Sequence, residues 1–479
     1  MRLKNILENI EVINKKNYKN YNIKSITHIS KDVIKDSMFI CLKGENFDGN
    51  KFVNDAIKNG AKCIITEDES LIADVTIVVV KNTRIAMSII AKNFYNRACE
   101  DLNIIGVIGT CGKTTTCHII SELLSNNDDY IGNIGTNGIY IGKNRLNNNF
   151  TTPDPLELHY IFYRMKLLGV KTVVMEVSAQ AISLYKMYGI KLKIGVFTNI
   201  SNEHLDFFKT MENYARCKMD YFNKINMDEC VVNIDDFYGR ELAYKVTIPC
   251  ISYGINSPAN SFALNIKSDF DGLSFFANIL DDVIEVKTKM LGAYNTYNLL
   301  AGMTVAKMLG KTVQDIFYKI NNLSIIPGRF NVYSFDGKMI VVDFAHTPDS
   351  IEKLLSCVKC FSKGKIITIF GCVGYSDKEK RIDMAKAVDK YSDNIIITTD
   401  NRGNTPYKDI VKDIIGGIKG ENYMCIEDRR SSIIFGYNLL MKDDILVVLG
   451  KGAEDFQKIG DEKIPYSDID CVEELLNKG

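Results

Sequence analysis

Residues 109–116, Gly-Thr-Cys-Gly-Lys-Thr-Thr-Thr, are the stretch of the sequence best suited to chemistry. An apolar run typical of a buried strand precedes them, and a helical pattern follows. Glycines at such a turn let several backbone N–H groups point at one phosphate, and a helix start adds its positive dipole end. Lys113 could then neutralise the outer phosphates of a nucleotide, and the Thr114 hydroxyl could bind Mg²⁺. Val107 stands where the full P-loop pattern has its first glycine, so a glycine turn with an exposed lysine is the alternative.

Charged and polar residues also stand where two further apolar runs end. Glu176 follows Val-Val-Met, and His204 lies in Thr-Asn-Ile-Ser-Asn-Glu-His-Leu-Asp at 198–206. Ligands of open α/β sheets bind at the carboxyl ends of strands, so both residues are candidates for a metal or phosphate contact. A solvated glutamate and a surface or core histidine are the alternatives. By itself, Lys218 has the pattern of a solvated helix lysine.

Short apolar runs alternate with helical patterns along the whole chain, which indicates α/β layers. The predicted strands lie in 36–44, 61–67, 75–82, 103–109, 171–178, 193–201, 339–346, 365–374, 394–401 and 444–452, and a helix is predicted near 51–60. The last four runs are apolar almost throughout, as in a parallel sheet buried on both faces. With a boundary at the Pro327-Gly328 turn, we predict three α/β domains at 1–100, 101–326 and 327–479.

The composition excludes several classes of protein. Lys and Arg (59) balance Asp and Glu (59), so no net field favours nucleic acid or an anionic membrane. No apolar run reaches the roughly 18 residues of a membrane span, and the N-terminus lacks the apolar core of a secretory leader. The 13 cysteines are scattered, which suits reduced thiols in the cytoplasm; Cys357 and Cys360 are expected to be packing positions on a helix. We expect a monomeric, cytoplasmic protein without membrane insertion.

Further motifs follow the phosphate loop in a fixed order. They are T-T-P-D-P at 151–155, M-E-V-S at 175–178, T-N-I-S-N-E-H-L-D-F-F at 198–208, E-N-Y-A-R-C-K at 212–218, L-G-A-Y-N-T-Y-N at 291–298, P-G-R-F at 327–330 and V-D-F-A-H-T-P-D-S at 342–350. With these motifs the chain resembles the Mur ligase family over nearly its whole length, most closely the MurE type. That type adds the third residue of the peptidoglycan stem to UDP-N-acetylmuramoyl-L-alanyl-D-glutamate.

The resemblance implies an N-terminal UDP-binding α/β domain, a central P-loop ATPase-like domain and a C-terminal Rossmann-like domain. It implies ATP as a substrate, Mg²⁺ as a cofactor, and UDP-MurNAc-dipeptide and an amino acid as the other substrates. The implied ATP contacts are Gly109, Thr110, Cys111, Gly112, Lys113, Thr114, Thr115, Asn295, Arg329 and Asp343. The implied catalytic and metal-binding residues are Lys113, Thr114, Glu176, His204 and Lys218, the last as a carbamate (N6-carboxylysine). The implied UDP-precursor contacts are Ser30, Glu45, Asn46, Phe47, Thr151, Thr152, Ser178 and Lys186. The implied amino-acid contacts are Arg381, Asp400, Asn401, Arg402, Gly450 and Glu454.

Several positions depart from the family pattern. Cys111 stands for an asparagine, Gln180 for a histidine, Leu184 for a glutamine and Lys186 for an arginine. His-Ile-Ser-Lys at 28–31 replaces Asp-Ser-Arg, Asp-Asn-Arg-Gly at 400–403 lacks the proline of Asp-Asn-Pro-Arg, and Ala453 replaces a histidine.

These departures leave alternatives open for the substrates. A paralogue acting on another carboxylate is one of them, and a non-catalytic nucleotide-binding regulator is another. For the incoming amino acid, Arg402 and Glu454 favour meso-diaminopimelate over L-lysine. Cys372, Asp400 and Gly450 each follow an apolar strand, so their loops should converge at the ligand edge of one sheet.

Overall fold

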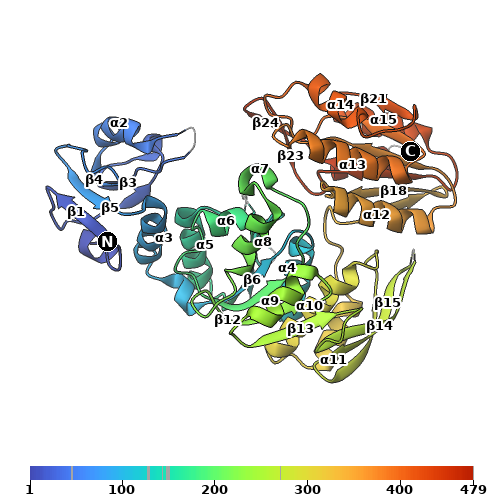
Figure 1. The fold of residues 1–479 in the computed structure, drawn as a ribbon, viewed down its shortest axis with the longest axis horizontal. Helices are drawn as coiled ribbons and strands as arrows, with labels where there is room; N and C mark the ends of the chain where they lie inside the picture. Colours follow the sequence, from blue (N-terminus) through green and yellow to red (C-terminus); the bar gives the residue numbers. More distant parts are fainter. Residues whose placement is uncertain (45–46, 127–129, 143, 147–150, 270, 478–479) are drawn as a thin grey trace.

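The computed structural model describes the chain except for residues 45–46, 127–129, 143, 147–150, 270 and 478–479. Three groups of elements follow one another along the sequence, each built on its own large sheet (Figure 1). The N-terminal group, in blue, packs its helix α3 (Thr83–Phe94) against α5 (Pro155–Leu167) of the central group. The C-terminal group, in orange and red, follows the central group. The fold is therefore mixed α/β, as the sequence indicates.

Five strands form the N-terminal sheet, in the order β1-β5-β4-β3-β2. The pairs are parallel except β1 with β5. The strands are β1 (Val12–Lys16), β2 (Ser25–Thr27), β3 (Ser37–Ile40), β4 (Ala61–Thr66) and β5 (Thr76–Val80), and the other helices are α1 (Leu3–Ile6), η1 (Ser30–Asp32), η2 (Gly49–Phe52) and α2 (Val53–Lys58). β3 and β5 are buried along their whole length, which is why their sequences are apolar without alternation.

The central sheet has eleven strands in the order β16-β15-β14-β13-β12-β11-β6-β10-β7-β8-β9. Its middle strands pair in parallel, and both edges are antiparallel. The strands are β6 (Asn103–Ile108), β7 (Ile131–Gly135), β8 (Gly138–Ile141), β9 (Asn144–Leu146), β10 (Thr172–Val177), β11 (Leu192–Phe197), β12 (Met227–Asn233), β13 (Cys250–Gly254), β14 (Ser261–Asp269), β15 (Gly272–Ile279) and β16 (Asp282–Thr288). The sequence prediction includes β6, β10 and β11 but neither antiparallel edge.

Helices cover both faces of the central sheet and enclose a hydrophobic core on each. Along β6, Ile104 belongs to one core and Ile105 to the other, because successive side chains of a strand point to opposite faces. The remaining helical elements are η3 (Ala98–Asp101), α4 (Lys113–Leu124), α6 (Ala179–Ser183), α7 (Leu205–Phe208), α8 (Met211–Met219), α9 (Phe237–Lys245), α10 (Asn295–Met308) and α11 (Val313–Asn321). α10 is buried on nearly all sides and packs against α4, so the helix that follows the phosphate loop is held firmly.

The C-terminal sheet has six strands in the order β17-β18-β22-β19-β20-β21. β18, β22, β19, β20 and β21 are parallel to their neighbours, which confirms the parallel sheet predicted from the last four apolar runs; β17 is antiparallel to β18. The strands are β17 (Asn331–Phe335), β18 (Lys338–Asp343), β19 (Ile366–Phe370), β20 (Asn394–Ile397), β21 (Tyr423–Cys425) and β22 (Ile445–Leu449), with a separate hairpin of β23 (Phe456–Ile459) and β24 (Glu462–Pro465). The helices are α12 (Pro348–Phe361), α13 (Lys378–Tyr391), α14 (Tyr407–Ile415), α15 (Arg429–Leu439) and α16 (Asp468–Leu476).

Within the described residues no helix is long and apolar enough to cross a membrane. The cysteines at the two C-x-x-C positions differ in environment. Cys357 packs against the C-terminal core, as expected for a packing position. Cys360 is exposed, so the expectation was wrong for this residue: it lies on the solvent side of α12, while the next residue, Phe361, packs against the core.

Candidate active site

The turn after β6 holds its shape because glycine occupies two crowded positions. A Cβ on Gly109 would lie 1.9 Å from the Thr198 hydroxyl oxygen, and one on Gly112 would lie 2.4 Å from the Asn298 Oδ1 atom. Gly112 also has a positive φ of 84°, which side chains avoid, and it caps the N-terminus of α4. The loop therefore brings its backbone and the start of α4 close together, as a phosphate-binding loop requires.

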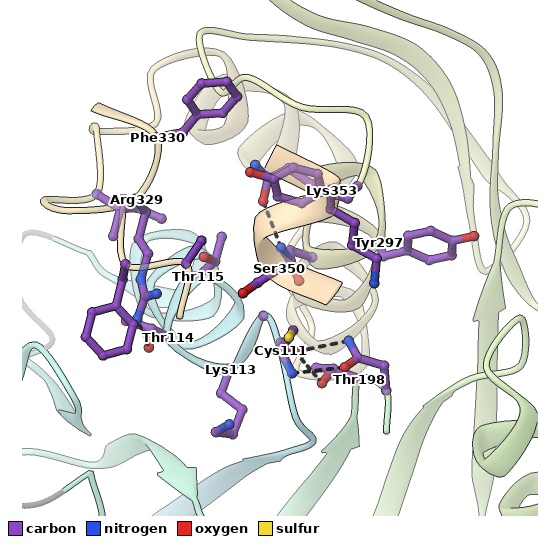
Figure 2. A pocket seen from close by; sticks show the side chains of 18 of the residues that line it. Cys111, Lys113, Thr114, Thr115, Thr198, Tyr297, Arg329, Phe330, Ser350 and Lys353 are labelled. Atoms are coloured by element: carbon purple, nitrogen blue, oxygen red, sulfur yellow. Dashed lines mark hydrogen bonds between the residues drawn. The ribbon is translucent and has the colours of Figure 1, made fainter. Parts of the chain in front are cut away.

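Lys113 and Thr114 lie at the first turn of α4, facing a cavity (Figure 2). The Lys113 Nζ atom donates to the carbonyl oxygens of Gly109 (3.0 Å) and Thr110 (2.7 Å), so the side chain folds over its own loop. The Thr114 hydroxyl donates to Glu176 Oε1 (2.9 Å) and accepts from Arg329 Nη2 (2.9 Å). Thr114 thus joins the central and C-terminal groups at the mouth of the phosphate loop.

Glu176 is buried at the end of β10, with 1% of its surface exposed. Its Oε1 atom accepts hydrogen bonds from the Thr114 hydroxyl and, at 2.8 Å, from the Thr136 N–H; its Oε2 atom accepts from the Thr136 hydroxyl at 3.2 Å. A carboxylate held by three donors beside a phosphate loop is aimed at that loop rather than at solvent. The sequence alternative of a solvated glutamate is therefore wrong.

His204 begins α7 in a left-handed backbone conformation with φ of 57°. Its Nε2 atom lies 3.7 Å from Glu203 Oε2, while Glu203 Oε1 lies 3.3 Å from His346 Nε2 on the C-terminal side. Burial would raise the pKa of Glu203, but the hydrogen bond with His346 and the charges of His204 and Lys113 hold it well below its ordinary value. Burial lowers the pKa of His204. Glu203 is thus an ionised, buried group that links two domains beside the phosphate loop.

Lys218 is buried, with 1% of its surface exposed. From α8 its Nζ atom reaches the Tyr214 hydroxyl (2.5 Å) and the Thr110 hydroxyl (3.3 Å). Burial, and then the positive charge of Lys113, lower its pKa well below the ordinary value for lysine. A lysine whose neutral amine is favoured can act as a nucleophile, which the pattern of a solvated lysine does not predict.

A cavity of about 660 Å³ lies between the central and C-terminal groups. Cys111, Lys113 and Tyr297 line it from the central group, and Ser350 and Lys353 from α12 (Figure 2). The other predicted ATP contacts in its lining are Thr110, Gly112, Thr114, Thr115, Asn295, Arg329 and Asp343. The one departure from the family pattern in this set, Cys111, donates its N–H to Asn199 Oδ1 at 2.9 Å, so the loop is anchored by its backbone.

Three further residues that line this cavity have side chains held by their neighbours. Asp343 accepts from the Phe330 and Ala345 N–H groups, both at 2.7 Å, and burial raises its pKa. Asn295 donates to the Leu291 carbonyl at 2.7 Å. The Arg329 guanidinium lies 4.4 Å from the Phe344 ring centre. These side chains therefore offer a rigid wall to a ligand.

The predicted UDP-precursor contacts fall in two groups. Thr151, Thr152, Ser178 and Lys186 gather near the end of β10: Thr152 donates to the Glu176 carbonyl at 2.9 Å, and Lys186 pairs with Asp154 at 2.7 Å. The others lie in the N-terminal group: Ser30 is in η1, Phe47 is half exposed and stacks on Phe52, and Glu45 and Asn46 lie outside the described residues.

The predicted amino-acid contacts lie at the carboxyl edge of the C-terminal sheet. A Cβ on Gly450 would lie 2.8 Å from Asp400 Oδ2, and Asn401 Nδ2 donates to Glu454 Oε2 at 2.9 Å. The predicted convergence of the β20 and β22 loops is thereby confirmed. Arg381 instead pairs with Asp413 at 2.9 Å and donates to the Gly374 carbonyl. Arg402 donates to the Thr405 carbonyl at 3.3 Å, and its buried Nε atom has no hydrogen-bond partner in the described part of the chain.

The connection from the central to the C-terminal group touches the β22 loop. Gly328 has φ of 70°, and a Cβ there would lie 2.0 Å from the Ala453 nitrogen and 2.8 Å from the Gly452 Cα. The next residue, Arg329, reaches Thr114. Backbone therefore packs on backbone between the cavity and the loop that follows β22.

Three residues of the site were missed by sequence reasoning. Glu203 and His346 pair across the domains, and Lys451 is buried among the amino-acid contacts. Glu203 and His346 stand inside motifs that carry the resemblance, but their pairing joins residues far apart in the sequence. Lys451 stands between two glycines, a position that in sequence reads as an exposed loop.

Comparisons with known proteins agree with this geometry. Residues 22–95 match the Mur ligase family catalytic domain, residues 107–306 the Mur ligase middle domain, and residues 328–452 the glutamate ligase domain of Mur ligases. The chain is 37% identical, over 100% of both chains, to UDP-N-acetylmuramoyl-L-alanyl-D-glutamate–2,6-diaminopimelate ligase of Clostridioides difficile. It is 36% identical to the enzyme of the same name from Aquifex aeolicus, over 95% of this chain and 94% of that one.

Solved structures show the same architecture. A structure of a UDP-N-acetylmuramoyl-L-alanyl-D-glutamate–2,6-diaminopimelate ligase superposes with a TM-score of 0.69 at 26% identity, covering 100% of this chain and 99% of that chain. MurF ligase from Thermotoga maritima in complex with ADP shares the fold, with a TM-score of 0.64 at 21% identity over 95% of this chain and 97% of that one. On its full-length similarity to these enzymes, the chain belongs to the Mur ligase family.

Proposed function

We propose that this protein is an ATP-dependent ligase that joins 2,6-diaminopimelate to UDP-N-acetylmuramoyl-L-alanyl-D-glutamate in peptidoglycan synthesis. Full-length relatives named for this reaction support the proposal. The observation that carries it is the convergence of Lys113, Thr114, Glu176 and Arg329 at one cavity between two domains. We further propose that it works as a monomer in the cytoplasm, with the domain boundaries predicted above, which the three separate sheets support.

ATP and Mg²⁺ fit the residues present. In the described part of the chain no three His, Cys, Asp or Glu side chains cluster closely enough to hold a metal by themselves. Mg²⁺ typically takes one or two carboxylates and completes its shell with water and substrate phosphates. The buried Glu176 and the Thr114 hydroxyl beside the phosphate loop, with His204 nearby, would supply such a partial set. When bound, Mg²⁺ would offset negative charge on the phosphoryl group in transfer.

The chemistry must activate a carboxylate, because a carboxylate does not react with an amine at neutral pH. The side carboxylate of the D-glutamyl residue attacks the γ-phosphorus of ATP, which gives an acyl phosphate and releases ADP. Lys113 stabilises the transferring phosphoryl group by leaving the Gly109 and Thr110 carbonyls. The amine of the incoming amino acid then attacks the acyl carbon, phosphate leaves, and the nitrogen loses its proton to give the amide. The two domains that face each other across the cavity would exclude water, which would hydrolyse the acyl phosphate.

We propose that Lys218 carries a carbamate. The neutral amine adds to CO₂, and the nitrogen loses a proton, which leaves a negatively charged carboxylate on the side chain. Burial with a lowered pKa favours the neutral amine that this addition needs. The adduct would place a negative charge near Lys113, in a position to help bind Mg²⁺. The hydroxyls of Tyr214 and Thr110 lie within reach to hold it.

Arg402 supports diaminopimelate over L-lysine. Arg381 is already neutralised by Asp413, whereas none of the described acidic residues pairs with Arg402. A partly buried guanidinium whose buried Nε atom has no hydrogen-bond partner among the described residues fits a carboxylate, and diaminopimelate has a distal carboxylate that lysine lacks. Although residues 400–403 lack the proline of the family's Asp-Asn-Pro-Arg motif, this loop therefore still offers an arginine to the substrate.

The second candidate function is that of a paralogue acting on another carboxylate. It is supported by a departure from the family pattern among the predicted UDP-precursor contacts. Lys186, where the family has arginine, pairs with Asp154 instead of presenting a two-pronged anion contact.

The test incubates the purified protein with ATP, UDP-N-acetylmuramoyl-dipeptide and either diaminopimelate or L-lysine. We expect diaminopimelate to be used, and Arg402→Ala to lose that preference. Use of L-lysine alone, or an unchanged preference in the variant, would refute the assignment of the amino acid. Turnover of neither would favour the paralogue.

A further inference from the structure

A buried lysine lies at the centre of the amino-acid loops. The Lys451 side chain is 0% exposed. Its Nζ atom lies 2.7 Å from Glu454 Oε2, 3.2 Å from Asn401 Oδ1 and 3.8 Å from Asp400 Oδ1. Asp400, Asn401 and Glu454, which the family resemblance implies as contacts of the incoming amino acid, are therefore joined by one ammonium group.

The contacts of Lys451 determine how its neighbours are oriented. Asn401 Oδ1 accepts from both Lys451 Nζ and the Lys458 N–H (2.8 Å), so its Nδ2 atom must point the other way, to Glu454. Glu454 Oε2 in turn accepts from both Lys451 and Asn401. The side chains from the β20 and β22 loops thus form one hydrogen-bond network, in which the orientation of each side chain is determined by its partners.

The charges in this set also point to a binding role. Asp400 and Glu454 are two carboxylates brought together from distant parts of the chain, and Lys451 is the cation between them. The three sum to one net negative charge, which one ammonium group of a substrate would balance. Burying a lysine costs desolvation that pairing only offsets, so such a group is a poor means of stabilising a fold.

We propose that Lys451 is a positioning residue for the incoming amino acid: it fixes Glu454 and Asn401 in the orientation that receives the distal ammonium group. This inference rests on the proposed function. It assigns Lys451 no contact with the reacting atoms. Without the lysine, the two carboxylates would repel each other, and Glu454 would turn away from the substrate.

The test is a double-mutant cycle with Lys451→Met and Glu454→Gln, measured by steady-state kinetics with diaminopimelate, ATP and UDP-N-acetylmuramoyl-dipeptide. Lys451→Met should raise KM for diaminopimelate roughly 10- to 100-fold, the usual range for losing a hydrogen bond to a charged group. KM for ATP should stay within about twofold, because the nucleotide cavity is not touched. In the Glu454→Gln background the same substitution should change KM by less than about threefold, because its partner is already lost.

Lys463→Met is the matched control, since this exposed lysine lies over the ring of Phe456, 4.3 Å from its centre, beside the same loop. It should change neither KM. Equal effects of Lys451→Met in both backgrounds, or parallel increases in KM for ATP and diaminopimelate, would overturn the assignment. If Lys451→Met fails to fold, the same double-mutant cycle with Lys451→Gln tests the assignment, with the same expected and contradicting results. Wild-type protein that does not use diaminopimelate overturns the proposed function and this assignment together, whereas additive effects in an active enzyme overturn this assignment alone.

Discussion

Arg429 and Arg430 are adjacent arginines in opposite environments, and they allow a sharp test of how the C-terminal domain is held together. Arg429 and Asp468 are both 0% exposed; Arg429 Nε lies 2.8 Å from Oδ1 and Nη2 lies 2.7 Å from Oδ2. Arg429 Nη2 also donates to the Leu449 carbonyl at 2.8 Å, one residue before the β22 loop. Arg430 pairs with Glu474, but both side chains are about half exposed.

Arg429→Met would leave Asp468 buried with the Tyr466 hydroxyl as its remaining side-chain donor among the described residues, at 3.0 Å. Breaking a buried ion pair by removing one partner costs about 3–5 kcal/mol of unfolding free energy. For a unit of this size that corresponds to a fall in Tm of roughly 6–20 °C. Arg430→Met removes only an exposed pair and should cost less than about 1 kcal/mol.

Differential scanning calorimetry and urea unfolding followed by circular dichroism measure both variants. The double variant Arg429→Met/Asp468→Leu removes the orphaned charge and should recover much of the loss. If Arg429→Met and Arg430→Met lose the same free energy of unfolding, burial does not determine how much each ion pair contributes to stability. A double variant no more stable than Arg429→Met would show that packing, and not the unpaired carboxylate, causes the loss.

Three further predictions concern lysine and histidine groups. Lys113→Ala should keep the fold and lower the ligation rate by a factor of about 10²–10³; near-normal turnover would contradict the role of the phosphate loop. Lys218→Ala should be nearly inactive and partly rescued by short-chain carboxylates, and full wild-type activity without CO₂ would exclude the carbamate. Burial lowers the pKa of His159 to about 3, so the folded protein keeps this side chain neutral while the unfolded chain takes up a proton as pH falls below about 6.5. The contribution of His159 to the free energy of unfolding is therefore complete above that pH and about 2 kcal/mol smaller at pH 5. Between pH 7 and pH 5, urea unfolding should show the free energy of unfolding of His159→Phe falling by about 2 kcal/mol less than that of the wild type, and an equal fall in both proteins would contradict this role.

Parallel strands such as β6, β10 and β22 were predicted because they are buried along almost their whole length and so consist of continuous apolar runs. The parallel strands β12, β13 and β21 were not predicted, because part of each strand is less deeply buried or exposed. The antiparallel edge formed by β14, β15 and β16 was not predicted, because its strands alternate buried and exposed residues. Alternation over short stretches resembles many loops and surface helices. The hairpin of β23 and β24 was not predicted for a similar reason: β24 is exposed along its whole length, so its sequence contains no apolar run.

The candidate site shows a similar division. The phosphate loop and Glu176 could be recognised because they depend on local geometry, a glycine turn and a strand end. Lys218 could not be placed by local pattern, since its burial comes from α8 packing its Tyr214 and Lys218 side chains against the loop at Thr110. The pair Glu203–His346 and the ammonium of Lys451 depend on contacts between residues that only the folded chain brings together.

The packing of Gly328 on Gly452 and Ala453 has a thermodynamic consequence. Arg329 beside Gly328 contacts the phosphate loop, and Glu454 beside Ala453 belongs to the amino-acid loops. A ligand that binds more tightly to one arrangement of this contact raises the affinity of any second ligand that prefers the same arrangement. Linkage requires the two factors to be equal, so the factor by which a bound nucleotide tightens the amino acid is the factor by which the amino acid tightens the nucleotide. A side chain added at Gly328 or Gly452 would change both affinities together, although neither glycine lies at the reacting atoms.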